Sequence, residues 1–239
     1  MGREFHVVFP LYPRVTQLDF TGPYEVFVRL PGARCTLASV TGGTLEIEGG
    51  MTFGALARLT DITQCALLCV PGGFGTVDAL EDEHYLSSLR RLGAQAQYVT
   101  SVCTGSLLLA AAGLLQGKRA ACHWAWRDQL AEFGVEASAE RVVRDGNVIT
   151  GGGVTAGIDM ALAVVAQIAG VEFAQTVELA LEYAPEPPFN CGRPENARPE
   201  IVEAARKRLN SLRGQRDDAV RRAAARLAQR ITTHTPARS

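Results

Sequence analysis

Long apolar runs and sorting signals are missing from this sequence. No stretch of its 239 residues approaches the roughly 20 consecutive apolar residues that a membrane-spanning helix needs. The N-terminal sequence MGREFHVVFPLYP also lacks the basic and then apolar segments of an export signal. These absences argue against an integral membrane protein, and we expect a cytoplasmic protein with no membrane partner.

Motifs for metal and nucleotide binding are missing as well. Among the six cysteines, Cys65 and Cys69 form a close pair, but their spacing does not match a zinc knuckle and they lie in an apolar run. The glycine-rich segment PGGFG (71–75) has neither the dinucleotide-binding pattern nor the lysine of a P-loop. We therefore expect no metal and no nucleotide cofactor, and we interpret most of the cysteines as buried free thiols.

Alternating strand and helix patterns fill most of the chain, and 47% of the residues are hydrophobic. Apolar runs of strand length, such as FHVVFPLY (5–12) and ALLCVPGG (66–73), are separated by segments with helical spacing, among them GPYEVFVRL with Pro23 in its first turn. Gly49-Gly50 and Asp145-Gly146 predict hairpins. This order predicts an α/β three-layer sandwich with a mostly parallel central sheet and right-handed crossovers.

The C-terminal segment differs from the rest of the chain in charge. Residues 198–239 contain 11 Lys/Arg and 4 Asp/Glu, although the whole chain has a net charge of −1. Apolar residues recur there every three or four positions, which predicts an amphipathic helix from about Glu200 to Ile231. We expect it to pack on its own domain or on a second subunit, with a solvated basic face and no nucleic-acid partner. The predicted division is a catalytic domain, 1–197, and this helix, 198–239.

The stretch YVTSVCTGSLLLAAAGLL (98–115) changes from a strand pattern to a helix pattern at Cys103. A residue in such a tight turn is held above the sheet, with backbone N–H groups of the new helix directed at it. The positive end of a helix lowers the pKa of a thiol. Because polar residues flank Cys103, we favour a reactive thiol over a buried structural cysteine.

A thiolate nucleophile needs an acid/base partner. The nearest histidine, His123, is as compatible with a hydrogen-bonded core residue as with catalysis. Asp19 and Glu25, in QLDFTGPYEV after the first strand, are carboxylates that could reach the thiol. A partly desolvated carboxyl group there would have a raised pKa and could move a proton near neutral pH. Asp19 could instead cap the following helix, a role for which Thr21 competes.

The loops that follow parallel strands meet at one edge of an α/β sheet, where ligands bind. Three segments fall at such positions: VTQLDFTGP, PGGFG and CTG. The backbone N–H groups of Gly72 and Gly73 are unobstructed by side chains, which suits contacts to the substrate or to an oxyanion. Without the strand before it, PGGFG would be only a flexible turn.

Taken together, QLDFTGPYEVF, VPGGFGT, YVTSVCTGSLLLAAAGLLQGKRAACHWAW and RVVRDGNVITGGGVTAGIDMAL resemble the DJ-1/PfpI superfamily and, within it, the isocyanide hydratases. The resemblance implies a flavodoxin-like fold, a homodimer and the hydration of an isocyanide to an N-substituted formamide through a covalent cysteine thioimidate. It places the nucleophile at Cys103, the general acid/base at Asp19 and an adjacent threonine at Thr104. Glu25 matches an acidic position that other members use to contact their cysteine. The implied reaction needs no metal, nucleotide or flavin.

Two other functions share these motifs. The same domain forms the ligand-sensing half of AraC-like transcription regulators, which carry a further helix-turn-helix region of roughly a hundred residues. Only one arginine-rich tail follows the domain here. Other cysteine-dependent members of the superfamily, such as glyoxalase-like enzymes, share the nucleophile and differ in the pocket.

Overall fold

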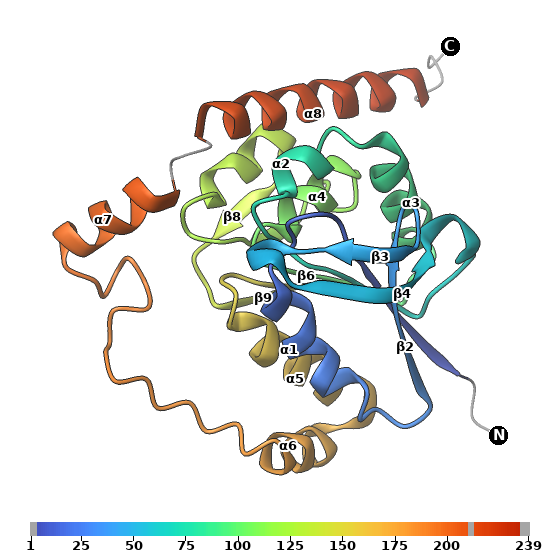
Figure 1. Ribbon diagram of the computed structural model, residues 1–239, viewed down its shortest axis with the longest axis vertical. Helices are drawn as coiled ribbons and strands as arrows, with labels where there is room; N and C mark the ends of the chain where they lie inside the picture. The colour runs from blue at the N-terminus through green and yellow to red at the C-terminus, as the bar shows by residue number, and fades with distance from the viewer. Residues whose placement is uncertain (1–3, 210–212, 235–239) are drawn as a thin grey trace.

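Parallel strands form the centre of the main sheet, and an antiparallel strand closes each edge. Within residues 4–209 and 213–234, which the computed structural model describes, this sheet has eight strands in the order β3-β4-β2-β1-β5-β6-β10-β9 (Figure 1). All neighbours pair in parallel except β3 with β4 and β9 with β10. The strands are β1 (Phe5–Pro10), β2 (Ala33–Ser39), β3 (Gly43–Glu46), β4 (Thr52–Arg58), β5 (Leu67–Val70), β6 (Tyr98–Val102), β9 (Val142–Asp145) and β10 (Val148–Gly151).

The central strands are covered on both faces. Every residue of β5 and of β10 is buried, as expected for parallel strands that lie between two helical layers. A separate parallel pair, β7 (Arg119–Ala121) and β8 (Glu136–Ser138), lies beside the main sheet. The continuous apolar runs of the sequence therefore become the middle of the core.

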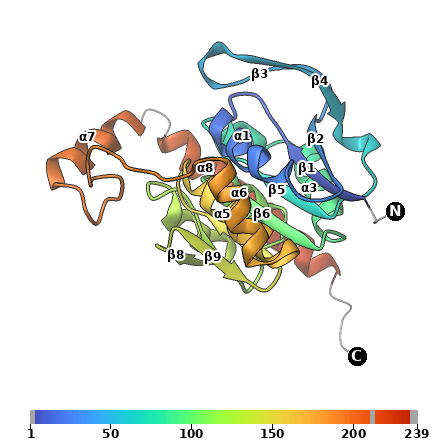
Figure 2. The same cartoon turned by 90° about the horizontal axis from the view of Figure 1, so that it is seen from below.

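Two helical layers cover the sheet, one on each face (Figures 1 and 2). One layer contains α1 (Gln17–Phe27), α5 (Ala156–Ala169) and α6 (Val171–Ala180). The other contains α2 (Thr76–Ala79), α3 (Glu83–Gly93), α4 (Gly105–Ala111), α8 (Arg213–His234) and the 3₁₀ segment η3 (Arg127–Phe133). This arrangement confirms the predicted α/β three-layer sandwich.

Both predicted hairpins are present. Gly49 and Gly50 lie between β3 and β4 with φ of 83° and 78°, a region that glycine adopts without steric cost. Asp145 ends β9, and Gly146, with φ of 64°, turns the chain into β10. The turn residues, together with the strand patterns beside them, predicted both connections correctly.

The prediction for Pro23 was wrong. It lies in the middle of α1, which begins six residues earlier at Gln17, and not in the first turn of a later helix. Proline in a helix interior removes one backbone hydrogen bond. Close packing accompanies this loss, because a Cβ on Gly157 of α5 would lie only 3.1 Å from the Pro23 ring. The tertiary contact between α1 and α5 overrides the local preference.

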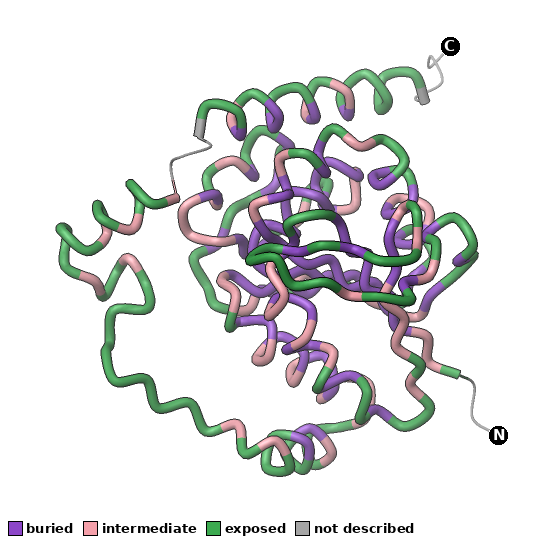
Figure 3. The backbone as a smooth tube through the Cα atoms, in the orientation of Figure 1, coloured by how far each residue is buried: buried purple, intermediate pink, exposed green. Residues whose placement is uncertain are grey.

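The C-terminal segment forms two helices where the sequence predicts one. α7 (Pro199–Leu209) and α8 lie on either side of 210–212, which fall within the predicted helix but outside the described residues, as do 1–3 and 235–239. α8 packs on α2, α4 and η3 and buries the apolar residues Ala219, Val220, Ala223 and Leu227 (Figure 3). It therefore packs on its own domain, whereas the boundary at residue 198 stays a prediction.

The basic face of α8 is partly paired. Arg222 and Arg226 both contact Glu81 at 2.9 Å, and Arg230 contacts Glu83 at 2.5 Å. In the described part of the chain, no helix is long and apolar enough to cross a membrane.

Candidate active site

Cys103 occupies a strained turn between β6 and α4. Its φ is 58°, a left-handed conformation that costs a residue with a side chain of order 1–3 kcal/mol. Its N–H donates to the Gly151 carbonyl oxygen at 3.0 Å, and its own carbonyl oxygen accepts from the His123 N–H at 3.3 Å. A Cβ on Gly105 would lie 2.1 Å from the Val70 carbonyl oxygen. The glycine two positions after Cys103 is therefore needed for the close approach of the new helix to β5.

Asp19 lies in the first turn of α1 and is fully buried. Its Oδ2 accepts a hydrogen bond from the Gly72 N–H at 2.8 Å. Its Oδ1 is buried and accepts no hydrogen bond from a nitrogen or oxygen atom of the described residues. The N-cap of α1 is Thr16, so Asp19 does not have the capping role that was its alternative. A buried carboxylate oxygen without a nitrogen or oxygen donor is unusual and is typical of a functional site.

Burial raises the pKa of Asp19 to about 7. Removal from water disfavours the charged carboxylate, and the hydrogen bonds from the Gly72 amide and the Cys103 thiol oppose this effect only in part. The carboxyl group therefore exchanges its proton near neutral pH, as the sequence predicted for a desolvated carboxyl group at this edge.

The prediction that the turn lowers the pKa of Cys103 is wrong for the free protein. Cys103 is only 5% exposed, and burial raises the pKa of its thiol well above the usual value, with the Asp19 charge as the next cause. The backbone N–H and hydroxyl of Thr104 act in the opposite direction. Desolvation is the larger effect, so the resting residue is a neutral thiol beside a carboxyl group.

Gly72 and Gly73 hold the neighbouring side chains. The Gly73 N–H donates to Thr104 Oγ1 at 2.9 Å, just as the Gly72 N–H donates to Asp19. A Cβ on Gly72 would lie 2.5 Å from the Thr104 N and 2.9 Å from Asp19 Oδ2. The two amides that we expected to face the substrate are thus engaged with Asp19 and Thr104.

Sequence reasoning missed Tyr12 and Thr76. The Thr76 hydroxyl lies 2.7 Å from Thr104 Oγ1 and 3.0 Å from the Tyr12 hydroxyl, which also donates to the Pro71 carbonyl oxygen. All of these groups are buried. Thr76 directly follows PGGFG, and Tyr12 is the last residue of the apolar run that precedes VTQLDFTGP, so closeness to these two segments is the signal that could have found them.

Glu25 is not brought to the site. It lies on the exposed side of α1, and its carboxylate pairs with Arg29, one turn along the helix, at 2.9 Å. Six residues separate it from Asp19, which places the two on different faces of α1. Of the two carboxylates left open by sequence reasoning, the structure brings Asp19 to Cys103.

His123 lies next to the turn and is neutral near pH 7. Burial lowers its pKa to about 4, and the charge of Arg216 contributes. Its Nδ1 accepts from the Ala125 N–H at 3.3 Å. Arg216 of α8 is 5% exposed, with its guanidinium 4.4 Å from the centre of the Trp126 ring. No sequence pattern predicted that the basic tail would place an arginine here.

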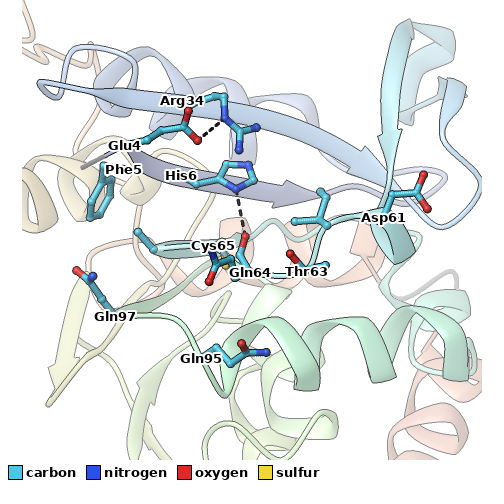
Figure 4. Close-up of a pocket in the computed structure, with 12 residues that line it drawn as sticks. Glu4, Phe5, His6, Arg34, Asp61, Thr63, Gln64, Cys65, Gln95 and Gln97 are labelled. Atoms are coloured by element: carbon cyan, nitrogen blue, oxygen red, sulfur yellow. Dashed lines mark hydrogen bonds and ion pairs between the residues drawn. The ribbon is translucent and has the colours of Figure 1, made fainter. Parts of the chain in front are cut away.

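Two cavities bear on the location of the site. One of about 680 Å³ lies at the amino-terminal ends of β1 and β5, the edge opposite Cys103, and is lined by polar residues such as His6, Arg34 and Gln97 (Figure 4). It contains none of the predicted site residues. The other, of about 200 Å³, is lined by Cys122, His123 and Gly152, next to the groups that bond the Cys103 backbone.

The sequence profile of the DJ-1/PfpI family matches residues 6–167. This chain belongs to the DJ-1/PfpI family. Both the predicted family and the predicted fold class are therefore confirmed. Like solved members of this family, the chain combines a parallel sheet with helices on both faces: DJ-1beta from Drosophila melanogaster superposes with a TM-score of 0.68 at 23% identity, covering 77% of this chain and all of that one.

Two relatives resemble this DJ-1/PfpI chain over nearly its whole length. It is 48% identical to an isonitrile hydratase from Pseudomonas putida, over 92% of this chain and 96% of that protein. A THiJ/PfpI family protein of known structure from Pseudomonas syringae is 36% identical, with a TM-score of 0.86 over 94% of this chain and 91% of the other. By contrast, the similarity to the HTH-type transcriptional regulator CdhR from Pseudomonas aeruginosa, at 34% identity, covers 60% of this chain and 43% of the regulator.

Proposed function

We propose that this protein is an isonitrile hydratase, which converts an isocyanide to an N-substituted formamide with Cys103 as the nucleophile. The observation that carries the proposal is the pairing of Cys103 with Asp19, a buried carboxyl group whose pKa is raised to about 7. The end-to-end similarity to an isonitrile hydratase supports the choice of reaction within the family.

The first step forms the thioimidate. The terminal carbon of R–N≡C is electrophilic, and the Cys103 sulfur adds to it while Asp19 takes the thiol proton and returns it to the same carbon. The product is R–N=CH–S–Cys103, which contains every atom of the isocyanide and the thiol. Thr104 stabilises the transient thiolate through its N–H and hydroxyl, the two groups that oppose the rise in the thiol pKa.

The second step adds water. Asp19 accepts a proton from a water molecule that attacks the thioimidate carbon, and the nitrogen becomes protonated. Collapse of the tetrahedral adduct R–NH–CH(OH)–S–Cys103 breaks the carbon–sulfur bond and releases R–NH–CHO, with the remaining proton returned to the thiol. The net reaction consumes one isocyanide and one water, and it needs no other reactant.

Gly72 and Gly73 support this chemistry by position. Their amides hold Asp19 and Thr104, both of which act on the Cys103 thiol. Because the Gly72 amide holds Oδ2, we assign Oδ1, which has no nitrogen or oxygen donor, as the oxygen that exchanges protons with the thiol and with water. A side chain at residue 72 would displace both groups.

The test of the proposal is turnover of a simple alkyl isocyanide. Purified protein incubated with cyclohexyl isocyanide should produce N-cyclohexylformamide, measured by proton NMR. Cys103→Ala and Cys103→Ser should both remain folded by circular dichroism and lose this activity, since an alkoxide is far harder to form than a thiolate. Turnover retained by either variant would remove the nucleophile assignment.

We also propose that the protein is a homodimer. Large apolar side chains are exposed on α6 and on the segment that follows it: Val171 is 62% exposed, Leu179 81% and Phe189 75%. Large apolar residues exposed to this extent commonly mark a protein interface.

A further inference from the structure

The cavity beside the Cys103 turn is lined by the domain and by the connector, residues 181–198, which joins α6 to α7. Cys122, His123 and Trp124 line one side, and Gly152 to Thr155 line another. The connector contributes the remaining lining residues Gly192, Arg193, Pro194 and Glu195. Its volume of about 200 Å³ corresponds to six or seven water molecules at roughly 30 Å³ each, which is room for a small organic group.

This cavity continues from the two segments that hold the nucleophile. The His123 N–H bonds the Cys103 carbonyl oxygen, and the Cys103 N–H bonds Gly151, the residue before Gly152. Cys103 itself does not line the cavity, but the cavity begins at residues next to those that bond its backbone, so we place it beside a substrate whose terminal carbon reaches Cys103. The group attached to the isocyano nitrogen is the part of the substrate that it would receive.

The charges that line the cavity do not balance. Arg141 pairs with Asp159, and Glu140 pairs with Arg119 at 2.7 Å, so both have partners outside the cavity. The remaining charged groups are Arg127, Arg193 and Glu195.

Two guanidinium groups thus share a single carboxylate. Glu195 lies 3.6 Å from Arg127 and 3.9 Å from Arg193, longer than a well-formed hydrogen-bonded ion pair. Arg193 is also anchored to the Ala139 carbonyl oxygen, which fixes it over the cavity. The three groups carry a net charge of +1, and their loose pairing leaves donors available for a second carboxylate.

Cations from the C-terminal helices add to the positive potential. The Arg206 guanidinium of α7 lies 5.7 Å from the centre of the Trp124 ring in the cavity wall. Arg127 and Arg216 also act electrostatically on Cys122 in the cavity wall, lowering its pKa against the larger effect of burial. An anionic group would be favoured here over a neutral one.

We propose that the substrate of this enzyme is an isocyanide that carries a carboxylate, and that Arg127 and Arg193 bind this carboxylate in the cavity lined by the connector. The inference rests on the proposed hydration of isocyanides. Glu195 competes for the same two guanidinium groups and is displaced when the substrate binds. Residues 192–195 of the connector thereby help to determine which substrate is bound.

The experiment compares acids with their methyl esters. Isocyanoacetate, 4-isocyanobutanoate and 6-isocyanohexanoate, each measured beside its methyl ester, vary the distance between the isocyano and carboxylate groups at constant chemistry. The wild-type enzyme should hydrate at least one acid with a kcat/KM about tenfold above that of its ester, mainly through a lower KM. The preference should weaken at high salt, because part of this site is exposed.

Three variants locate the preference. Arg127→Gln and Arg193→Gln should reduce the ratio of acid to ester kcat/KM toward one, whereas Glu195→Gln should increase it. The matched control is Arg198→Gln, on the same connector but outside the cavity and paired with Glu200 at 3.0 Å, which should keep the wild-type ratio.

The outcomes separate the two proposals. If neither acids nor esters are hydrated, the proposed function fails and the inference fails with it. If the esters are hydrated and the acids are equal or slower at every length, only the carboxylate preference is overturned. If an acid preference exists but is the same in Arg127→Gln, Arg193→Gln and Arg198→Gln, the assignment to this cavity is wrong.

Discussion

At the scale of single residues, Cys103 and Asp19 are kept in a state that favours proton exchange over permanent charge. Both are almost fully enclosed, and burial raises the pKa of each. A pre-formed thiolate would be costly in this environment, whereas a thiol that passes its proton to an adjacent carboxylate as it attacks avoids the buried charge. The proposed mechanism therefore depends on Asp19 as much as on Cys103.

Replacement of the two acidic candidates tests this role. Asp19→Asn keeps the size and an oxygen for the Gly72 amide but cannot exchange a proton, so kcat should fall by about a hundred- to ten-thousand-fold. Glu25→Gln should stay within a few-fold of the wild type, since Glu25 pairs with Arg29 at the surface. Steady-state rates of formamide production measure both. A larger loss in Glu25→Gln than in Asp19→Asn would reverse the assignment.

The buried Asp19 carboxyl group should lower the free energy of unfolding at high pH. Because the pKa of Asp19 rises from 3.8 in the unfolded chain to about 7 in the folded one, its contribution to stability is lost as the pH rises through this range. Asp19→Asn should therefore be more stable than the wild type at pH 8, by up to roughly 4 kcal/mol, with the difference vanishing near pH 4.

Urea unfolding of the wild type and of Asp19→Asn at several pH values measures this difference in stability. Glu25→Gln is the control, since it removes a carboxylate from the same helix at an exposed position and should change stability little. An Asp19→Asn variant that is no more stable than the wild type at pH 8 would contradict the raised pKa.

At the scale of elements, α8 is part of the domain rather than an appended tail. One face packs on α2, α4 and η3, and its arginines pair with acidic residues at the start of α3 and just before it. Arg216 extends from this helix into the interior and stacks on Trp126 beside the site. The spacing of apolar residues predicted the amphipathic helix, but the surface that it covers depends on how the domain folds.

Substitutions at a buried and an exposed alanine of α8 distinguish the effect of packing on stability from the effect of helix propensity. Ala223 is 2% exposed and Ala225 is exposed on the opposite side of the same turn. Ala223→Asp buries a carboxylate and should lower the free energy of unfolding by about 2–4 kcal/mol, whereas Ala225→Asp, with the same change in helix propensity, should cost less than about 1 kcal/mol. Chemical denaturation measures both. Equal effects would show that this face of α8 does not pack as described.

At the scale of the whole molecule, the exposed apolar residues of α6 and the connector argue for a second copy. The protein should have about twice its chain mass of 25.6 kDa when measured by light scattering. Leu179→Lys should shift the equilibrium toward the monomer, because it places a charge on the most exposed of these side chains. The same substitution at Met51, an exposed apolar residue next to β4, is the control. A wild-type monomer at micromolar concentration would contradict the dimer.

The sequence by itself determined the layered fold and the turn that carries Cys103, the proposed nucleophile. Buried strands are readable because parallel strands enclosed on both faces need continuous apolar runs, and hairpins are readable because their turns need Gly49-Gly50 or Asp145-Gly146. The turn at Cys103 was readable for a similar reason, since a strand pattern and a helix pattern adjoin there with Gly105 at the close contact.

Only the tertiary structure decided between groups that are adjacent in sequence. Asp19 and Glu25 lie six residues apart in the same helix, and the rotation of α1 buries one and exposes the other. The pKa of Cys103 depends on how much water the folded chain removes, which local sequence does not encode, so burial outweighs the helix end that the sequence emphasised. The contact of Arg216 with Trp126 and the cavity wall formed by residues 192–195 likewise result from long-range packing. In both cases the residues in contact are separated by tens of residues along the chain.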